Sequence, residues 1–219
     1  MMTAICGSLS RHCQDVVDTL IDNLGTVKIS DYDGLMCRDT YHHGDLKAVI
    51  LAKAATLVAE RGADGISLRE LAREAGVSHA APAHHFTDRR GLFTTLAAEG
   101  WRMLADALAA ARPDFVDAAL AYVRFALDRP GHYAVMFDRS LVNSEDPELK
   151  AAQDAAGAEL AHGVGTLKDP RAKADPPSAA LAAWSLVHGY AMLRLNEAID
   201  TDDDPMAAVQ RIALMLFDG

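Results

Sequence analysis

The sequence lacks the features of a secreted, disulfide-stabilised or membrane-spanning protein. Its only cysteines are Cys6, Cys13 and Cys37; their spacing matches no zinc site, and their odd number is typical of reduced thiols. The N-terminal residues show no basic cluster before an apolar core, so no signal peptide is expected. The longest apolar run, residues 179–193, is too short for a bilayer core of about 30 Å. We therefore expect a cytoplasmic protein with no membrane partner, no metal and no cofactor.

Strand patterns are also missing. β-branched residues are sparse, and no apolar residues alternate with polar ones between turn signals. From Leu46 onward, apolar residues recur with a helical period of 3.6. Because 50% of the residues are hydrophobic, the chain can bury a sizeable core. These patterns predict an all-α fold.

The net charge of −10 is unevenly distributed. Residues 38–90 hold eight basic and seven acidic side chains and five of the nine histidines, whereas the remaining residues carry a balance of −11. An acidic remainder repels DNA. If the chain binds nucleic acid, the contact is therefore expected in residues 38–90, with the remainder facing away.

Three segments are predicted along the chain. Residues 1–38 have no long helical stripe, and we interpret residues 1–35 as either a disordered leader or an over-extended start that precedes Met36. Residues 39–88 are predicted to form a head of three helices, and residues 89–219 a larger helical domain. The helices of this larger domain are expected at residues 89–112, 114–128, 132–137, 147–167, 177–199 and 205–217, with a polar loop at 168–177.

Capping signals set the limits of the head helices. Asp45 is predicted to cap the first helix, which Gly62 ends. Ser67 and Glu70 form a capping box at the start of the second. Ser78 is predicted to cap a third helix that reaches Phe86. Asp88 is the expected N-cap of the long helix that follows.

The second and third helices have helix-turn-helix spacing. The stretch Ser-Leu-Arg-Glu-Leu-Ala-Arg-Glu-Ala-Gly-Val-Ser spans residues 67–78, and His-Ala-Ala-Pro-Ala-His-His-Phe spans 79–86. Gly76 can adopt the conformation that a tight turn between two helices demands. Such a motif presents the start of its second helix to the major groove of DNA.

In this stretch the chain resembles the TetR family of bacterial repressors, from about Tyr41 to Leu96. The resemblance implies that His79 and Ala80 read base edges and that Ser78 contacts a phosphate. One residue departs from the family, because Ala83 replaces a phosphate-binding Tyr, at a cost of about 1 kcal/mol. The candidate DNA-binding residues are Arg69, Ser78, His79, Ala80, His84 and His85, together with Lys47 and His43 near the start of the first helix.

Phosphate neutralisation is expected from basic side chains outside the recognition helix, which has no Lys or Arg. The candidates are Arg69, Arg73, Arg89, Arg90 and Lys47. The alternative for each is a solvated charge on a helix face.

A second resemblance lies near the C-terminus. Trp184-Ser-Leu-Val-His188-Gly189 resembles a Trp-x-x-x-His-Gly motif in the ligand-binding domain of one TetR subgroup. Trp184 and His188 either line a ligand pocket or dimer interface, or simply share one buried helix face. A ligand site is expected between the long helix and those after Pro113. The candidate ligand-binding residues, which could instead be core, are Trp101, Phe115, Tyr122, Phe125, Tyr133, Met136, Phe137, Trp184 and His188.

The resemblance implies a ligand-responsive transcriptional regulator. We expect a repressor that is released from a palindromic operator by a small hydrophobic effector and that forms a homodimer through its last two long helices. No metalloprotease, nucleophile-elbow or P-loop pattern occurs, so no catalytic residue is expected. The alternative is a helical small-molecule sensor that has lost DNA binding.

Overall fold

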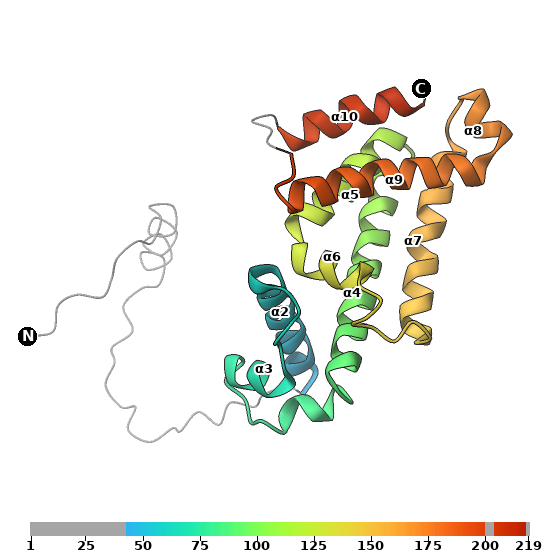
Figure 1. The fold of residues 1–219 in the computed structure, drawn as a ribbon. Coiled ribbons are helices and arrows are strands. Elements are labelled where there is room, and N and C mark those ends of the chain that lie inside the picture. Colours follow the sequence, from blue (N-terminus) through green and yellow to red (C-terminus); the bar gives the residue numbers. More distant parts are fainter. Residues whose placement is uncertain (1–42, 200–203, 218–219) are drawn as a thin grey trace, which may run out of the picture. The chain divides into compact units, whose positions relative to one another are not determined.

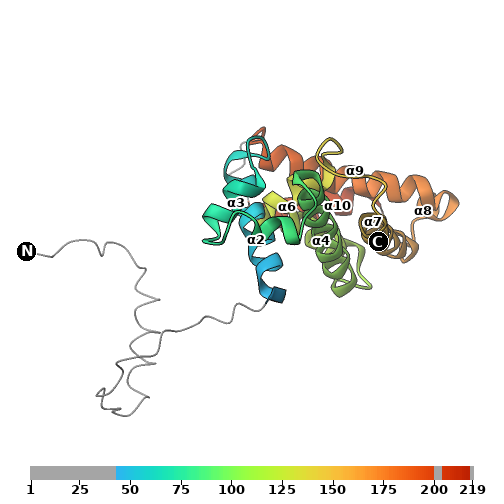
Figure 2. The same cartoon turned by 90° about the horizontal axis from the view of Figure 1, so that it is seen from below.

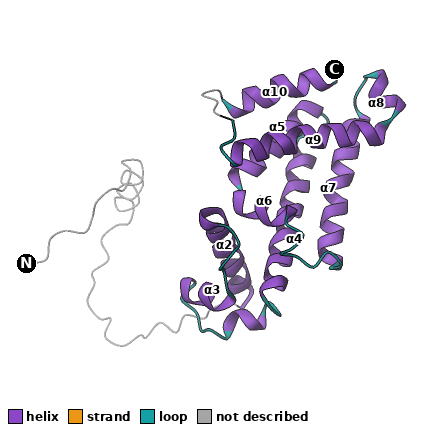
Figure 3. Cartoon of the chain, viewed as in Figure 1, coloured by secondary structure: helices purple, strands orange, loops and turns teal. Residues whose placement is uncertain are grey.

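The computed structural model describes residues 43–199 and 204–217. These residues form helices joined by short loops, with no strand among them (Figure 3). The predicted all-α fold is confirmed. The expectations for residues 1–38, and any role of the His43 side chain, fall outside the described part of the chain.

One long helix, one short helix and one 3₁₀ turn form the head, at one end of the described chain (Figure 1). They are α2 (His43–Arg61), α3 (Leu68–Glu74) and the 3₁₀ helix η1 (Ala81–His84). The predicted N-cap Asp45 is wrong, because α2 begins two residues earlier and Asp45 lies inside its first turn. The predicted end at Gly62 is confirmed, since this glycine has a φ of +78° and its N–H bonds to the Val58 carbonyl.

The long helix α4 (Arg89–Ala110) connects the head with the rest of the described chain (Figure 1). Asp88 caps it as predicted, because its carboxylate accepts a hydrogen bond of 2.7 Å from the Gly91 N–H. Along α4, large apolar side chains such as Leu92, Leu96 and Leu104 are fully buried. This helix is therefore the central support of the fold.

The remaining described helices follow α4 in the chain, and the first three of them pack directly against it. They are α5 (Phe115–Asp128), α6 (Pro130–Phe137), α7 (Pro147–Gly165), α8 (Pro170–Ala174), α9 (Pro176–Leu195) and α10 (Pro205–Leu216). The predicted loop at 168–177 is partly wrong, because it contains α8. Buried Asp169 accepts the Arg171 N–H at 2.7 Å, and Pro170 occupies the first helical position, where no N–H is needed.

Packing places α2 and α7 on opposite sides of α4 (Figures 1 and 2). One apolar core continues from α2 and α3 through α4 to α9 and α10. Gly131 of α6 lets that helix lie against the α2 backbone, since a Cβ there would stand 1.9 Å from the Ala55 carbonyl oxygen. A smaller cluster joins the end of α7 to α8, α9 and Phe217.

Candidate functional site

The turn between α3 and η1 has the geometry that the sequence predicts. Ser67 caps α3, as its hydroxyl accepts the Glu70 N–H at 3.2 Å. The Glu70 carboxylate does not complete the predicted box; it pairs with Arg61 instead. Gly76 has a φ of +68°, which allows the sharp change of direction after α3.

The segment after this turn differs from the prediction. A third α-helix capped by Ser78 is wrong, because the regular part is the single 3₁₀ turn Ala81–His84, whose N-cap is Ala80 with no side-chain hydrogen bond. The Ser78 carbonyl, not its hydroxyl, accepts the Ala81 N–H at 3.0 Å. Pro82 has no N–H and restrains Ala81, so the backbone closes i to i+3 bonds instead of an α-helix.

Most of the predicted DNA-binding side chains lie on the surface of the head. Exposed side chains are those of Arg69, Ser78, His79, Ala80, His84 and Lys47. His85 is half-buried, and its ring lies 6.3 Å from that of Phe86. Phe86 is buried and anchors the segment in the core. The head thus presents a polar, histidine-rich surface around the turn.

The four arginines predicted to neutralise phosphate differ in their surroundings. Arg69 is exposed and makes no ion pair within the described part of the chain. Arg73 lies near two carboxylates, at 3.8 Å from Glu70 and 3.4 Å from Glu74. Arg69 is therefore the arginine on α3 whose charge is available to a phosphate.

Arg89 and Arg90 instead hold the protein together. The Arg89 guanidinium donates to the carbonyls of Ala63 and Ile66, at 2.8 and 2.9 Å, and lies over the Phe93 ring. Arg90 donates twice to the Val142 carbonyl, at 2.8 and 3.0 Å. These bonds tie α4 to the head and to the α6–α7 loop. Because a carbonyl does not neutralise a guanidinium, the phosphate contacts of Arg89 and Arg90 stay a prediction beside this structural role.

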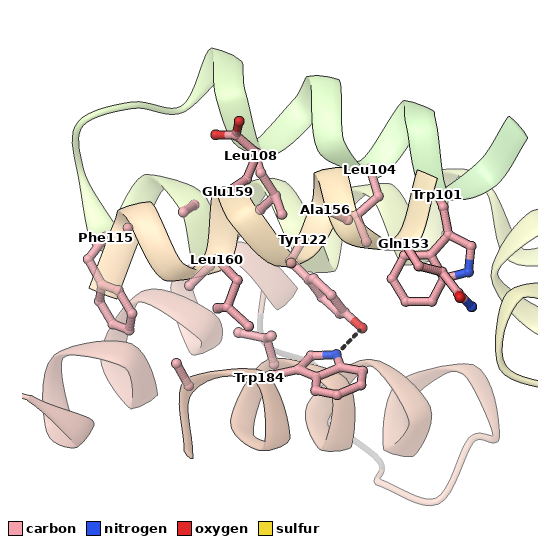
Figure 4. A pocket seen from close by; sticks show the side chains of 16 residues that line it. Trp101, Leu104, Leu108, Phe115, Tyr122, Gln153, Ala156, Glu159, Leu160 and Trp184 are labelled. Carbon is pink, nitrogen blue, oxygen red and sulfur yellow. Dashed lines mark hydrogen bonds between the residues drawn. The ribbon is translucent and has the colours of Figure 1, made fainter. Parts of the chain in front are cut away.

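A mainly apolar cavity of about 300 Å³ lies between α4, α5, α7 and α9 (Figure 4). Four of the predicted ligand-binding residues line it: Trp101, Phe115, Tyr122 and Trp184. The sequence analysis did not predict the lining residues of α7 or the leucines of α4. The main ones are Leu104, Leu108, Gln153, Ala156, Glu159 and Leu160. The small residues on one face of α7 could have indicated this wall, because small side chains leave space beside a helix.

The other predicted ligand-binding residues lie outside this lining. Phe125, Tyr133 and Met136 are buried in the core, and Phe137 and His188 are half-buried. The ring centroids of Phe137 and His188 are 4.4 Å apart. Phe137 and Tyr133 pack against the cavity wall, with ring centroids 5.1 Å from Trp101 and 6.1 Å from Tyr122, respectively.

A chain of hydrogen bonds runs from the cavity wall into the core. The Trp184 indole donates to the Tyr122 hydroxyl at 3.2 Å (Figure 4). The Tyr133 hydroxyl lies 3.4 Å from that of Tyr122 and 2.8 Å from His188 Nδ1, and the Tyr122 hydroxyl itself lies 3.1 Å from the same nitrogen. With neutral His188 as the final acceptor, each step has one donor and one acceptor.

Burial keeps this chain uncharged. It lowers the pKa of His188 below its ordinary value, so the imidazole is neutral at pH 7 and can accept at Nδ1. Burial likewise raises the pKa values of Tyr122 and Tyr133, so both hydroxyls keep their protons. The polar groups of Tyr122, Tyr133, Trp184 and His188 therefore satisfy one another.

The comparisons with known proteins agree with this architecture. A family model described as bacterial regulatory proteins of the tetR family matches residues 50–96, and one described as a tetracyclin repressor-like C-terminal domain matches residues 115–216. The solved structure of a protein of unknown function from Rhodococcus sp. RHA1 is 33% identical, with 81% of this chain and 96% of that chain covered and a TM-score of 0.67. The chain belongs to the TetR family.

Two other structures share the fold of this TetR family protein. The TetR family transcriptional regulator PfmR from Thermus thermophilus is 21% identical, with 78% of this chain and 97% of that chain covered and a TM-score of 0.61. A regulatory protein of the tetR family from Rhodococcus RHA1 is 23% identical, with 78% and 94% covered and a TM-score of 0.62. Comparison with curated protein sequences gives no match.

The two matched domains are those of a transcription factor, not of an enzyme. The helix-turn-helix model covers α3 and η1, so this TetR family protein is a DNA-binding regulator. The C-terminal model covers α5 to α10, which include three of the four helices around the cavity. None of the helices in the described ranges is long and apolar enough to cross a membrane.

Proposed function

We propose that this protein is a homodimeric repressor that a small molecule, bound in the cavity, releases from a pseudo-palindromic operator. The observation that carries the proposal is the continuity of α4. Its first residue, Arg89, is bonded to head carbonyls, and about three to four turns later Trp101 and Leu104 line the cavity. A displacement of α4 by a ligand therefore reaches the head without passing through a flexible joint.

DNA contact is assigned to the exposed surface of the head. His79 and Ala80 approach base edges, while Arg69 and Lys47 contact phosphates, with Ser78, His84 and His85 beside them. The local charge supports this surface, because Arg69 is exposed and makes no ion pair within the described ranges. Acidic side chains predominate in the rest of the chain.

The test is fluorescence anisotropy with labelled DNA from upstream of the protein's own gene, over a series of salt concentrations. Tight binding should weaken steeply with salt, because phosphate contacts release counterions. Arg69→Ala should reduce the slope of log affinity against log salt by about 1 for each phosphate that the guanidinium neutralises. Arg112→Ala is the matched control, since that guanidinium is paired with Glu159 beyond the end of α4 opposite the head and should leave the slope unchanged. Equal slopes for all three proteins would refute the assignment.

Dimerisation is assigned to the outer faces of α9 and α10. Large apolar side chains are exposed there: Leu181, Trp184, Met192, Leu193, Leu214 and Met215. Met215 is 83% exposed and Leu181 is 61% exposed, which is unfavourable in water unless another surface covers them. Pairing of two copies about a two-fold axis buries both sets at once.

Sedimentation of the purified protein tests the dimer. The unaltered chain should sediment as a dimer at micromolar concentration, and Met215→Glu combined with Leu214→Glu should give monomers. Ala59→Glu on exposed α2 adds a charge outside this face and should leave the dimer intact. A monomeric unaltered protein would refute the assignment.

The ligand response requires that the ligand binds more tightly to the conformation that is incompatible with the operator. Adding a cavity ligand to the protein–DNA complex should then lower the anisotropy, at concentrations that match its affinity for the free protein. If a ligand binds but leaves operator affinity unchanged, the response is refuted.

The structure also gives a reason to keep the second candidate function, a sensor without DNA binding. The recognition segment, residues 78–86, has a single 3₁₀ turn around Pro82 as its regular part. Ala83 supplies no hydroxyl for a phosphate. Absence of DNA binding at low salt, by a protein shown to be folded and dimeric, would select this alternative.

A further inference from the structure

The recognition segment of the head carries histidines in place of permanent cations. Residues 78–86 contain three histidines and no Lys or Arg. His79 and His84 are exposed, whereas His85 is half-buried. Histidine is the side chain whose charge ordinarily changes between pH 5 and 8. The charge of this segment therefore depends on pH, unlike that of a segment built on lysine and arginine.

Neither exposed imidazole is engaged within the protein. Within residues 43–199 and 204–217, the ring nitrogens of His79 and His84 make no hydrogen bond and no ion pair, whereas those of His132 include one 3.1 Å from the Glu99 carboxylate. The two rings are therefore available to a partner outside the chain.

The carboxylates of the helix that packs against η1 are already paired. That helix is α3, and its charged residues are Arg69, Glu70, Arg73 and Glu74. Glu70 is paired with Arg61, and Glu74 lies 3.4 Å from Arg73 and 3.7 Å from Lys53. A phosphate that approaches an imidazolium on this surface therefore meets little competition from α3.

The third histidine has different surroundings. His85 lines a polar cavity of about 580 Å³ beside the start of α4. The charged residues of its lining are Lys47, Asp88, Arg90, Asp146 and Glu148. Because charges of both signs surround this half-buried ring, the inference below rests on His79 and His84 alone.

Permanent positive charge is scarce in this part of the sequence. Residues 38–90 have eight basic and seven acidic side chains, a balance of +1. Protonation of His79 and His84 raises that balance to +3. The change is large for DNA binding, since the strength of non-specific binding depends on how many phosphates a protein neutralises.

We propose that this protein takes up protons at His79 and His84 when it binds DNA, so that its affinity for DNA rises as the pH falls. The inference deepens the proposed DNA contact and rests on it. A nearby phosphate favours the protonated form of an imidazole, because opposite charges attract. An imidazolium also donates from both ring nitrogens, which suits His79 at a base edge that carries acceptors, such as that of guanine.

Fluorescence anisotropy at pH 6, 7 and 8 tests the pH dependence. The probes are the labelled duplex from upstream of the protein's own gene and a labelled duplex of unrelated sequence. Affinity for both should rise at least about tenfold from pH 8 to pH 6, since one proton taken up corresponds to about tenfold per pH unit. The slope of log affinity against log salt should steepen by about 0.9 for each imidazolium that replaces a counterion. Circular dichroism at each pH shows that the protein stays folded.

Three variants assign the protons. His79→Gln combined with His84→Gln keeps polar side chains that cannot be charged, and should remove most of the pH dependence. His84→Arg has a permanent charge, so it should bind more tightly than the unaltered protein at pH 8 and depend less on pH. His162→Gln is the matched control, because His162 is exposed in the last turn of α7, away from α3 (Figure 1), and should leave the pH dependence unchanged.

Titration calorimetry on the unaltered protein counts the protons directly. The heat of DNA binding at pH 7 is compared in PIPES and imidazole buffers, which differ in their heat of ionisation. The difference should correspond to about one to four protons taken up per dimer, and to fewer in the double glutamine variant.

The outcomes are distinct. Equal affinity at pH 6 and pH 8 would overturn the proton uptake, and the proposed DNA contact would stand. A pH dependence that persists in the double glutamine variant would overturn the assignment to His79 and His84. Proton uptake that is lost in that variant, with a steeper salt slope at pH 6, supports the inference. If the folded protein binds neither duplex at pH 6 and low salt, the proposed DNA contact fails, and the inference fails with it.

Discussion

Replacing Gly131 by alanine should destabilise the contact between the head and the rest of the fold. The added Cβ would stand 1.9 Å from the Ala55 carbonyl oxygen and 2.7 Å from its carbonyl carbon. Ordinary contacts begin near 3.4 Å, so α6 must move by about 1.5 Å. The obstacle is helix backbone, which cannot rotate away as a side chain does.

Overpacking of this kind costs about 1–3 kcal/mol. For a chain of this length, each kcal/mol lowers the melting temperature by roughly 2–4 °C. We therefore expect Gly131→Ala to melt roughly 2–12 °C below the unaltered protein when unfolding is followed by circular dichroism. Protein concentration must be the same in all samples, because dimerisation adds to stability.

Gly157→Ala is the matched control. Gly157 lies inside α7, and a Cβ there would meet no atom within 4 Å. Alanine should therefore stabilise the helix by about 0.5–1 kcal/mol and raise the melting temperature slightly. If Gly131→Ala melted at the same temperature as Gly157→Ala, the close approach of α6 to α2 would be refuted.

Three further predictions concern stability. Asp88→Ala should cost about 1 kcal/mol by removing the α4 cap, whereas Asp154→Ala, exposed within α7, should change the melting temperature little; equal effects would contradict the capping role. Arg90→Ala should likewise cost about 1 kcal/mol, measured by urea unfolding, because it frees the Val142 carbonyl; unchanged stability would contradict this structural role of Arg90. Burial lowers the folded-state pKa of His188, so the unfolded chain binds more protons and stability should fall as pH drops below about 6.5. His188→Gln should flatten that dependence of melting temperature on pH, and equal slopes would contradict it.

Local signals in the sequence were sufficient for several helix ends and for the turn after α3. Ser67 and Asp88 are caps whose effect lies within three residues, and Gly76 occupies a left-handed conformation that other residues resist. The C-terminal end of α2 at Gly62 follows the same rule. Such features depend on neighbouring residues in the chain, so the sequence alone contains the information that determines them.

The recognition segment was mispredicted where two local rules compete. Ser78 is a good N-cap residue, and the apolar spacing to Phe86 favours a helix. Pro82 removes a backbone donor and restrains Ala81, and the observed 3₁₀ turn follows from that restraint. The penalty of a proline depends on its position within a helix, and helix ends are the least certain part of a sequence-based assignment.

The roles of the arginines depend on distant segments. Arg89 and Arg90 are adjacent to the DNA head in sequence, which made them candidates for phosphate contacts. Arg90 finds its acceptor on Val142, 52 positions away, and Arg89 finds Ala63, 26 positions away. A charge count places basic residues near DNA, but it cannot distinguish a free guanidinium from one that is bonded within the protein.

The cavity depends on the same kind of long-range information. Aromatic residues of α4, α5 and α9 were recognisable as candidates, and four of them line it. The wall from α7 is built largely from small side chains, which have no distinctive apolar pattern and matter only because they leave space. The sequence therefore predicts that a cavity lies beside α4, whereas its walls are known only when all four surrounding helices are placed. Since residues from four helices form the walls, the shape of this cavity is a property of packing and not of a motif.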